Sequence, residues 1–223
     1  MSKTITVKGV GSVSAKPDYV TISMTIETVN TRYDEAMEEA AGRIERLKAA
    51  AVCAGYEKDA LKTVSFRVET RYDNVRNPHG GFTREFAGYA CLYRLKLAFD
   101  LDGGQLARVI GAIADSGAKP EVGISFTVKD PAGVSEELLV SATENARAKA
   151  EILCRASGNR LGELLSIDYN WGELNIVSPT SYDMGDSVQP MMLSQCAAPE
   201  IEPEEIRLTD TVTFVWALVS EVK

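Results

Sequence analysis

Hydrophobic and polar residues alternate in five stretches of the chain, with the period of two that marks a β-strand with one buried face. The first stretch places Val20, Ile22, Met24 and Ile26 on one face. The apolar positions of the other four are Val64, Phe66 and Val68; Tyr89, Cys91, Tyr93, Leu95 and Leu97; Val122, Ile124, Phe126 and Val128; and Val212, Phe214, Trp216 and Leu218. Strands of a parallel sheet covered on both faces would read as unbroken apolar runs, so the pattern favours antiparallel sheets with helices packed on one face.

Three stretches between these strands have helical periodicity. Each begins at a residue whose side chain can cap a helix and ends near a glycine. The predicted helices run from Thr31 to Gly55, from Asp102 to Gly117 and from Asp130 to Gly158. Together with the strands they predict an α+β fold in the order ββαββαβαββ, with a long protruding β-hairpin.

The hairpin is predicted around residues 77–81, and its strands are unusually long. We expect strands of about 12 to 15 residues against a usual 5 or 6, which at about 3.3 Å per residue would span roughly 40 to 50 Å. Such a hairpin would extend beyond its own domain and leave open edges. We therefore predict an oligomerisation device with assembly or partner contacts at Asn77, Pro78, His79 and Phe82; the alternative is a hairpin folded back on its own helices.

Gly9 and Gly11 form the Gly-x-Gly of the opening segment ITVKGVGSVSAKPDYV. A phosphate-binding glycine loop needs backbone N–H groups at the start of a helix. Here another predicted strand follows, and Pro17-Asp18 marks its entry. The sequence therefore predicts a bulge or sharp bend between two strands at the glycines rather than a phosphate site.

Composition describes an ordinary globular protein. The chain has 223 residues, of which 45% are hydrophobic and 25% charged. We predict a single domain over 1–223, built from two intertwined α+β subdomains: roughly 1–100 with the C-terminal strand, and 101–172. The net charge of −8 argues against nucleic acid as a partner, because its backbone attracts basic patches. No segment reaches the roughly 20 apolar residues of a membrane span, and no secretion signal is recognised, so we expect a cytoplasmic protein.

The excess negative charge lies near the C-terminus. From 161 to 206 the chain has nine Asp and Glu residues and no Lys or Arg. Within it, residues 174–204 are predicted to form an irregular acidic connection. Met191 and Met192 are predicted to make assembly or partner contacts there, as a loop packed on a neighbour; the alternative is a surface for a loosely held cation or a basic partner.

Candidate catalytic chemistry is sparse. His79 is the single histidine and is predicted at a hairpin tip, where nothing would surround it with a nucleophile and an acid. The serines lack the G-x-S-x-G pattern, and no spacing selects a pair among the 32 acidic residues. We read the four cysteines as reduced thiols, because they are widely spaced and form no C-x-x-C: Cys53, Cys91, Cys154 and Cys196. No catalytic residue, metal ligand or cofactor is predicted.

The segment Ile5-x-Val7-x-Gly9-x-Gly11-x-Val13-x-x-x-Pro17-Asp18 resembles the opening signature of the SIMPL (DUF541) family, which includes bacterial outer-surface and oxidative-stress-associated proteins. The likeness covers essentially the whole chain. It continues through Gly88-Tyr89, Gly117-Ala118, Ile124-x-Phe126, Asp130, the helix from 142 to 156 and the turn at 199–206. A glycine usual in that turn is replaced by Glu204, so the turn type can differ. The resemblance implies an α+β fold and, in some members, ring-like or channel-like oligomers; it implies no agreed catalytic residues or cofactor.

Three hypotheses for function follow. The leading one is a non-enzymatic homo-oligomer that serves as a scaffold or a stress-related assembly. The second is a module that binds a small molecule or peptide in a groove between sheet and helices, lined by Tyr169 and Trp171. The third is a hydrolase with a carboxylate pair.

Overall fold

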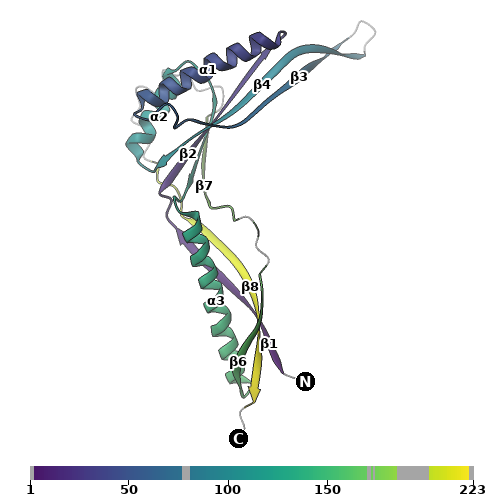
Figure 1. The fold of residues 1–223 in the computed structure, drawn as a ribbon, viewed down its shortest axis with the longest axis vertical. Helices are drawn as coiled ribbons and strands as arrows, with labels where there is room; N and C mark the ends of the chain where they lie inside the picture. The colour runs from purple at the N-terminus through teal and green to yellow at the C-terminus, as the bar shows by residue number, and fades with distance from the viewer. Residues whose placement is uncertain (1–2, 77–80, 170–171, 173, 185–200, 221–223) are drawn as a thin grey trace. The chain divides into compact units, whose positions relative to one another are not determined.

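The computed structural model describes residues 3–76, 81–169, 172, 174–184 and 201–220 (Figure 1). The chain divides into two units that each combine distant segments. The three-stranded unit consists of Met1–Pro17, Thr127–Pro179 and Glu204–Lys223, and the five-stranded unit consists of Asp18–Phe126 and Thr180–Pro203. These boundaries differ from the predicted subdomains, because the C-terminal strand belongs with the first strand and the third helix rather than with residues 18–100.

The five-stranded unit contains an α+β sandwich of one sheet and two helices. Its sheet has the strand order β3-β4-β2-β5-β7. The strands are β2 (Tyr19–Asn30), β3 (Lys62–Arg76), β4 (Phe82–Asp100), β5 (Glu121–Thr127) and β7 (Val177–Met184). Helices α1 (Tyr33–Cys53) and α2 (Gly103–Asp115) pack on one face, where Leu47 of α1 and Val109 of α2 join a single core with the alternating apolar residues of β2. The predicted face of β2 is confirmed.

The three-stranded unit packs one long helix on an antiparallel sheet of order β1-β8-β6. The elements are β1 (Thr4–Ala15), β8 (Ile206–Ser220), β6 (Asn159–Asp168) and α3 (Pro131–Ala156). Small residues bring the helix close: Ala142, Ala146 and Ala150 are fully buried against Val7 and Phe214. The α+β class is confirmed.

Gly9 and Gly11 do not bend the chain, and the predicted bulge is wrong. Both lie inside β1, which pairs with β8 residue by residue from Thr4 to Ala15. A Cβ atom at Gly9 would lie 2.1 Å from the carbonyl oxygen of Ala142, and one at Gly11 would lie 2.2 Å from that of Leu138. The two glycines therefore provide the space for α3 to lie directly on the strand.

The same helix also binds the outer edge of β1. The N–H of Val10 donates to Oδ1 of Asn145 at 3.0 Å, and the N–H of Ser12 donates to the Ser141 hydroxyl at 3.2 Å. Nζ of Lys149 donates to the carbonyl of Lys8 at 3.3 Å. Because these backbone groups face away from β8, the side chains of α3 take the place of a further strand.

Two of the three predicted helix starts are confirmed. The carboxylate of Asp102 accepts the N–H of Gln105 at 2.6 Å, and that of Asp130 accepts the N–H of Gly133 at 2.9 Å. The predicted cap at Thr31 is wrong. Its hydroxyl instead donates to Oδ1 of Asn30, and α1 begins two residues later with Arg32 in ion pairs to the acids of its first turn.

Two further expectations for the strands are corrected. The order has one more strand than predicted, ββαββαβαβββ, because residues 177–184 of the supposed irregular connection form β7. In β3, Phe66 and Val68 alternate as predicted, but Val64 is an extra residue in the pairing with β4. None of the three is buried, and Val64 is 62% exposed. The pattern identified a strand but not a buried face.

We predict that Gly11→Ala destabilises the protein by about 2 kcal/mol or more, because the added methyl group must displace the backbone of α3. Gly42→Ala is the matched control. Gly42 is exposed on α1 with no atom near its missing Cβ, so this change should leave stability equal or raise it by up to about 1 kcal/mol. Urea unfolding of both variants measures the difference, and equal stability for Gly11→Ala would contradict the close packing.

Candidate functional site

The four edges of the two sheets are protected to different degrees. An open strand edge presents unpaired N–H and C=O groups and invites pairing with another chain. The edge of β1 is bound by α3, as described above. The edge strand β6 shifts register twice against β8, near Leu164, and β7 contains Pro179. Bulges and prolines both interrupt continuous pairing.

The fourth edge belongs to β3 and is long and regular. Among the described residues, no strand pairs with its outer side. From Ser65 to Arg76 the strand contains no proline and no extra residue; its one irregularity lies at Val64. Nearly every residue of β3 is exposed. This edge is therefore an uninterrupted template of 12 residues in the described structure.

The hairpin formed by β3 and β4 extends beyond the first turn of α1 (Figure 1). We call residues 70–76 and 82–89 the arm. One face of the arm carries a row of ring contacts: Tyr33 of α1 meets Tyr89 at 5.8 Å between ring centroids, Tyr89 meets Phe86 at 5.3 Å, and Phe86 meets Tyr72 at 5.8 Å. The guanidinium of Arg84 lies 4.6 Å from the centre of the Tyr72 ring. We call these four rings the aromatic row.

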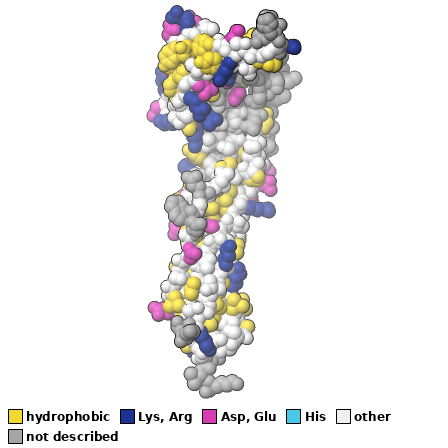
Figure 2. Space-filling model, turned by 90° about the vertical axis from the view of Figure 1, so that its right-hand side faces the viewer, with side chains coloured by type: hydrophobic (Ala, Val, Ile, Leu, Met, Phe, Trp, Pro, Cys, Tyr) yellow, Lys and Arg dark blue, Asp and Glu magenta, His cyan; other side chains and the backbone are white. Residues whose placement is uncertain are grey.

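Three of the four rings in the aromatic row are exposed: Tyr33 is 50% exposed, Tyr72 43% and Phe86 47%, while Tyr89 is partly buried. Phe82, which begins β4 outside the row, is 73% exposed. Figure 2 shows hydrophobic side chains gathered at the surface near the upper end of the view, with charged side chains around them. Apolar rings grouped in this way are typical of a contact surface, unlike apolar residues scattered singly.

A bulge in β4 keeps the row on one face. Phe86 and Tyr89 are three residues apart, so in a regular strand they would point to opposite faces. The pairing with β3 passes from Arg71 opposite Gly88 to Tyr72 opposite Phe86, which leaves Ala87 as an extra residue. Gly88 has φ of +147°, and a Cβ there would lie 2.5 Å from the carbonyl oxygen of Asn30. Only glycine fits this bulge without strain.

The opposite face of β3 carries charges of alternating sign. Nη2 of Arg71 lies 2.6 Å from Oε1 of Glu27 on β2, and Nη1 of Arg67 lies 3.9 Å from Oε2 of Glu69. Asp73 follows two positions after Arg71. The even-numbered residues of β3 therefore form an aromatic face, and the odd-numbered residues from Arg67 to Asp73 form a charged face.

A small polar depression of about 240 Å³ lies beside these charges, lined by Glu27, Arg43, Arg71, Lys119 and Glu121 among others. Each nitrogen of the Arg43 guanidinium already donates one hydrogen bond to the backbone. The guanidinium donates at 2.7 Å to the backbone carbonyls of Glu27, Ala118 and Lys119, and so ties α1 to β2 and to the loop before β5. We read the depression as part of this structural tie.

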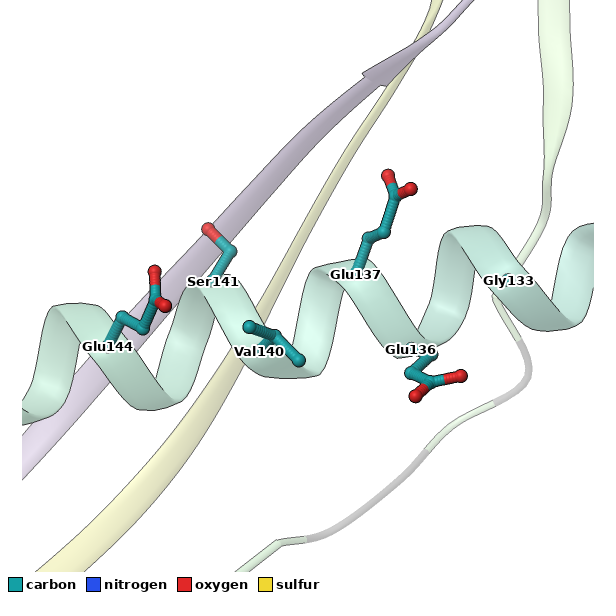
Figure 3. Close-up of a pocket in the computed structure, with 6 residues that line it drawn as sticks. All are labelled: Gly133, Glu136, Glu137, Val140, Ser141 and Glu144. Atoms are coloured by element: carbon teal, nitrogen blue, oxygen red, sulfur yellow. The ribbon is translucent and has the colours of Figure 1, made fainter.

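A second depression, of about 410 Å³, lies open along α3 (Figure 3). Its carboxylates come from Glu136, Glu137 and Glu144 of the same helix. Glu136 points away from Glu137 and Glu144 in this view, so the three do not converge on one point. This surface offers no enclosed geometry for general acid and base groups.

The predicted contact residues are only partly within the described structure. Phe82 begins β4 and is exposed, as the oligomerisation hypothesis requires. Asn77, Pro78, His79, Met191, Met192 and Trp171 lie outside the described residues. The site residues that the sequence reasoning missed are Tyr72, Arg84 and Phe86. Tyr72 continues the alternation of Phe66 and Val68 along β3, whereas the place of Phe86 in the row depends on the bulge at Ala87, which no local pattern displays.

Tyr169 of the predicted groove is turned inward. Its hydroxyl donates to Oδ2 of Asp210 at 2.9 Å, and this hydrogen bond to a carboxylate raises the pKa of the Tyr169 hydroxyl. Its ring packs against the core of the three-stranded unit. The contact fixes β8 rather than presenting the hydroxyl to a ligand.

The cysteines and charged groups give no further site in the described part of the chain. Cys53 is exposed, while Cys91 and Cys154 are buried, and all three are free thiols. Burial raises the pKa of the Cys91 thiol. No group of three or more metal-binding side chains is found among the described residues. Within those residues, no helix is long and apolar enough to cross a membrane.

Comparison with known families identifies the chain. The model of the SIMPL family, described as a protein of unknown function (DUF541), matches residues 5–216. The protein therefore belongs to the SIMPL family, as the opening glycine signature predicted. A search of curated proteins gave no match.

We predict that Arg43→Lys destabilises the protein by about 2 kcal/mol, because one ammonium group cannot replace a planar fork that reaches three carbonyls. Arg46→Lys, an exposed change on the same helix, should stay within about 0.5 kcal/mol of the parent. Urea unfolding measures both. A similar stability for the two variants would show that the three hydrogen bonds of Arg43 contribute little.

Proposed function

We propose that this SIMPL-family protein is a non-enzymatic homo-oligomer that works as a scaffold, and that the arm is its assembly surface. The observation that carries the proposal is the aromatic row, which lies exposed beside the one long, regular sheet edge in the described structure. Both features are unfavourable in an isolated chain and favourable once covered by protein.

The physical basis is the apolar area on the arm. Tyr72, Phe82 and Phe86 expose a large part of their rings, and covering apolar surface contributes about 25 cal/mol per Å². Aromatic side chains are enriched where interfaces are most strongly bound. The guanidinium of Arg84 lies over the Tyr72 ring. Arginine and aromatic side chains are both enriched in interfaces, where arginine can also donate hydrogen bonds to a partner.

The alternative functions have less support. A ligand groove at Tyr169 would have to break its hydrogen bond to Asp210. A carboxylate-pair hydrolase would need two acids facing one another across a cleft, whereas Glu136, Glu137 and Glu144 line one open helix surface. A stress-related role and a cytoplasmic location stay predictions from the sequence.

The test is the mass of the native protein by size-exclusion chromatography with light scattering, over a range of concentrations. We expect the parent to form a defined oligomer and the double variant Tyr72→Ser/Phe86→Ser to shift to a smaller species, because it removes two rings of the contact surface.

The matched control is Ile152→Ser on α3, which replaces an apolar residue that is 58% exposed outside the arm. It should leave the mass unchanged. Circular dichroism checks that all variants are folded. A parent that stays monomeric up to about 100 μM, a concentration at which contacts of about −5.5 kcal/mol would be visible, would overturn the proposal.

A further inference from the structure

We propose that two copies of the chain pair through the outer edges of their β3 strands, antiparallel about a two-fold axis at Thr70. This inference rests on the proposed assembly function and specifies its contact. The two five-stranded sheets would become one continuous sheet. The partner is thus a second copy of this chain, joined by main-chain hydrogen bonds.

Symmetry restricts how the two strands can pair. A two-fold axis perpendicular to the sheet keeps each side chain on its own face, and directly opposite residues of antiparallel strands share a face. Residues that oppose each other must therefore be an even number of positions apart, so the axis passes beside one residue and its copy. Between Ser65 and Arg76 only a few such centres leave a long overlap.

The charges of β3 select among these centres. With the axis at Thr70, Arg67 lies opposite the partner's Asp73, and Glu69 lies opposite the partner's Arg71. Each of these pairs occurs twice by symmetry, so the charged face contains four oppositely charged cross-strand pairs. On the other face Val68 lies opposite the partner's Tyr72, an aliphatic-aromatic pair of the kind that stabilises sheets.

The neighbouring centres are worse. An axis at Glu69 places two Glu69 side chains together and Arg67 opposite the partner's Arg71. An axis at Arg71 places two Arg71 side chains together and Glu69 opposite the partner's Asp73. An axis at Val68 keeps only the pair of Arg67 with the partner's Glu69, and an axis at Tyr72 keeps only the pair of Arg71 with the partner's Asp73. Both also shorten the stretch over which the two strands pair. Like charges directly opposite destabilise a sheet, so the sequence of β3 favours one register.

The pairing also fits the backbone. The bulge at Ala87 lies in β4, and the irregularity of β3 at Val64 lies before the overlap, so the outer strand stays regular from Ser65 onward. Since the axis keeps the faces, the aromatic rows of both copies would lie on the same side of the joined sheet. Charges on an edge strand usually oppose pairing. Here their alternating sign opposes wrong registers and permits one.

The first test is a charge swap at Arg67 and Asp73, which avoids Arg71 because that side chain also holds Glu27. Arg67→Asp alone or Asp73→Arg alone places like charges opposite each other twice. We expect each single variant to associate at least about tenfold more weakly than the parent by analytical ultracentrifugation.

An equimolar mixture of the two single variants restores all the opposite pairs, and so does the double variant Arg67→Asp/Asp73→Arg. Both should return to within about threefold of the parent affinity. Rescue in the mixture cannot come from a change in folding, since each chain carries its own substitution. If neither combination restores the affinity, or if the single variants associate like the parent, the pairing of β3 about an axis at Thr70 is wrong.

The second test is a crosslink at the axis in a Cys53→Ser/Cys196→Ser background. The two thiols of Thr70→Cys should lie with Cβ atoms about 4.5 to 5.5 Å apart, within reach of a short dithiol crosslinker. The matched control Ser65→Cys places its two thiols ten positions apart along the joined strands, about 33 Å, and should not crosslink.

The outcomes separate this inference from the broader proposal. A parent that is monomeric contradicts both. A parent that assembles while Thr70→Cys fails to crosslink keeps the scaffold proposal and overturns the pairing at β3. Crosslinking of Ser65→Cys with an assembled parent would show a different register.

Discussion

The backbone groups at the edge of a β-sheet need hydrogen-bond partners, and this requirement organises the whole structure. In the three-stranded unit these partners come from a helix of the same unit. Asn145, Ser141 and Lys149 of α3 bind the edge of β1, and the paired glycines of β1 let the helix approach closely enough to do so. In the five-stranded unit the edge of β3 has no such helix among the described residues.

The contrast gives a physical meaning to the signature of the family. Gly9 and Gly11 are positions where any side chain would collide with the backbone of α3. Gly88 serves the other unit, where it permits the bulge that holds Phe86 and Tyr89 on one face. Gly9 and Gly11 therefore allow α3 to cover the surface of β1. Gly88 instead keeps the exposed aromatic surface of the hairpin continuous.

Much of the fold could be predicted from local chemistry. Asp102 and Asp130 start their helices because a carboxylate near the first N–H groups is a local interaction that the sequence displays directly. The alternation at Val20–Ile26 succeeded because α1 and α2 cover that face of β2. The same alternation at Val64, Phe66 and Val68 misled because periodicity states which residues share a face and not what covers it.

The candidate site was less accessible to prediction for the same reason. The hairpin was predicted as an arm from strand length alone, but the aromatic row depends on the bulge at Ala87, which brings Phe86 and Tyr89 onto one face against the simple period of two. Gly9 and Gly11 were misread because their contact is with a helix more than 120 residues away. Long-range contacts of this kind leave no local pattern.

The most direct measurement is residue-resolved hydrogen exchange of β3 at high and low protein concentration. In a single chain, alternate amides of residues 65–76 point away from β4 and should exchange rapidly, while the others are protected. The account predicts that in the assembled protein consecutive amides around Thr70 are protected, and that dilution restores the alternating pattern. Alternating protection that persists in the assembled protein would contradict pairing at this edge.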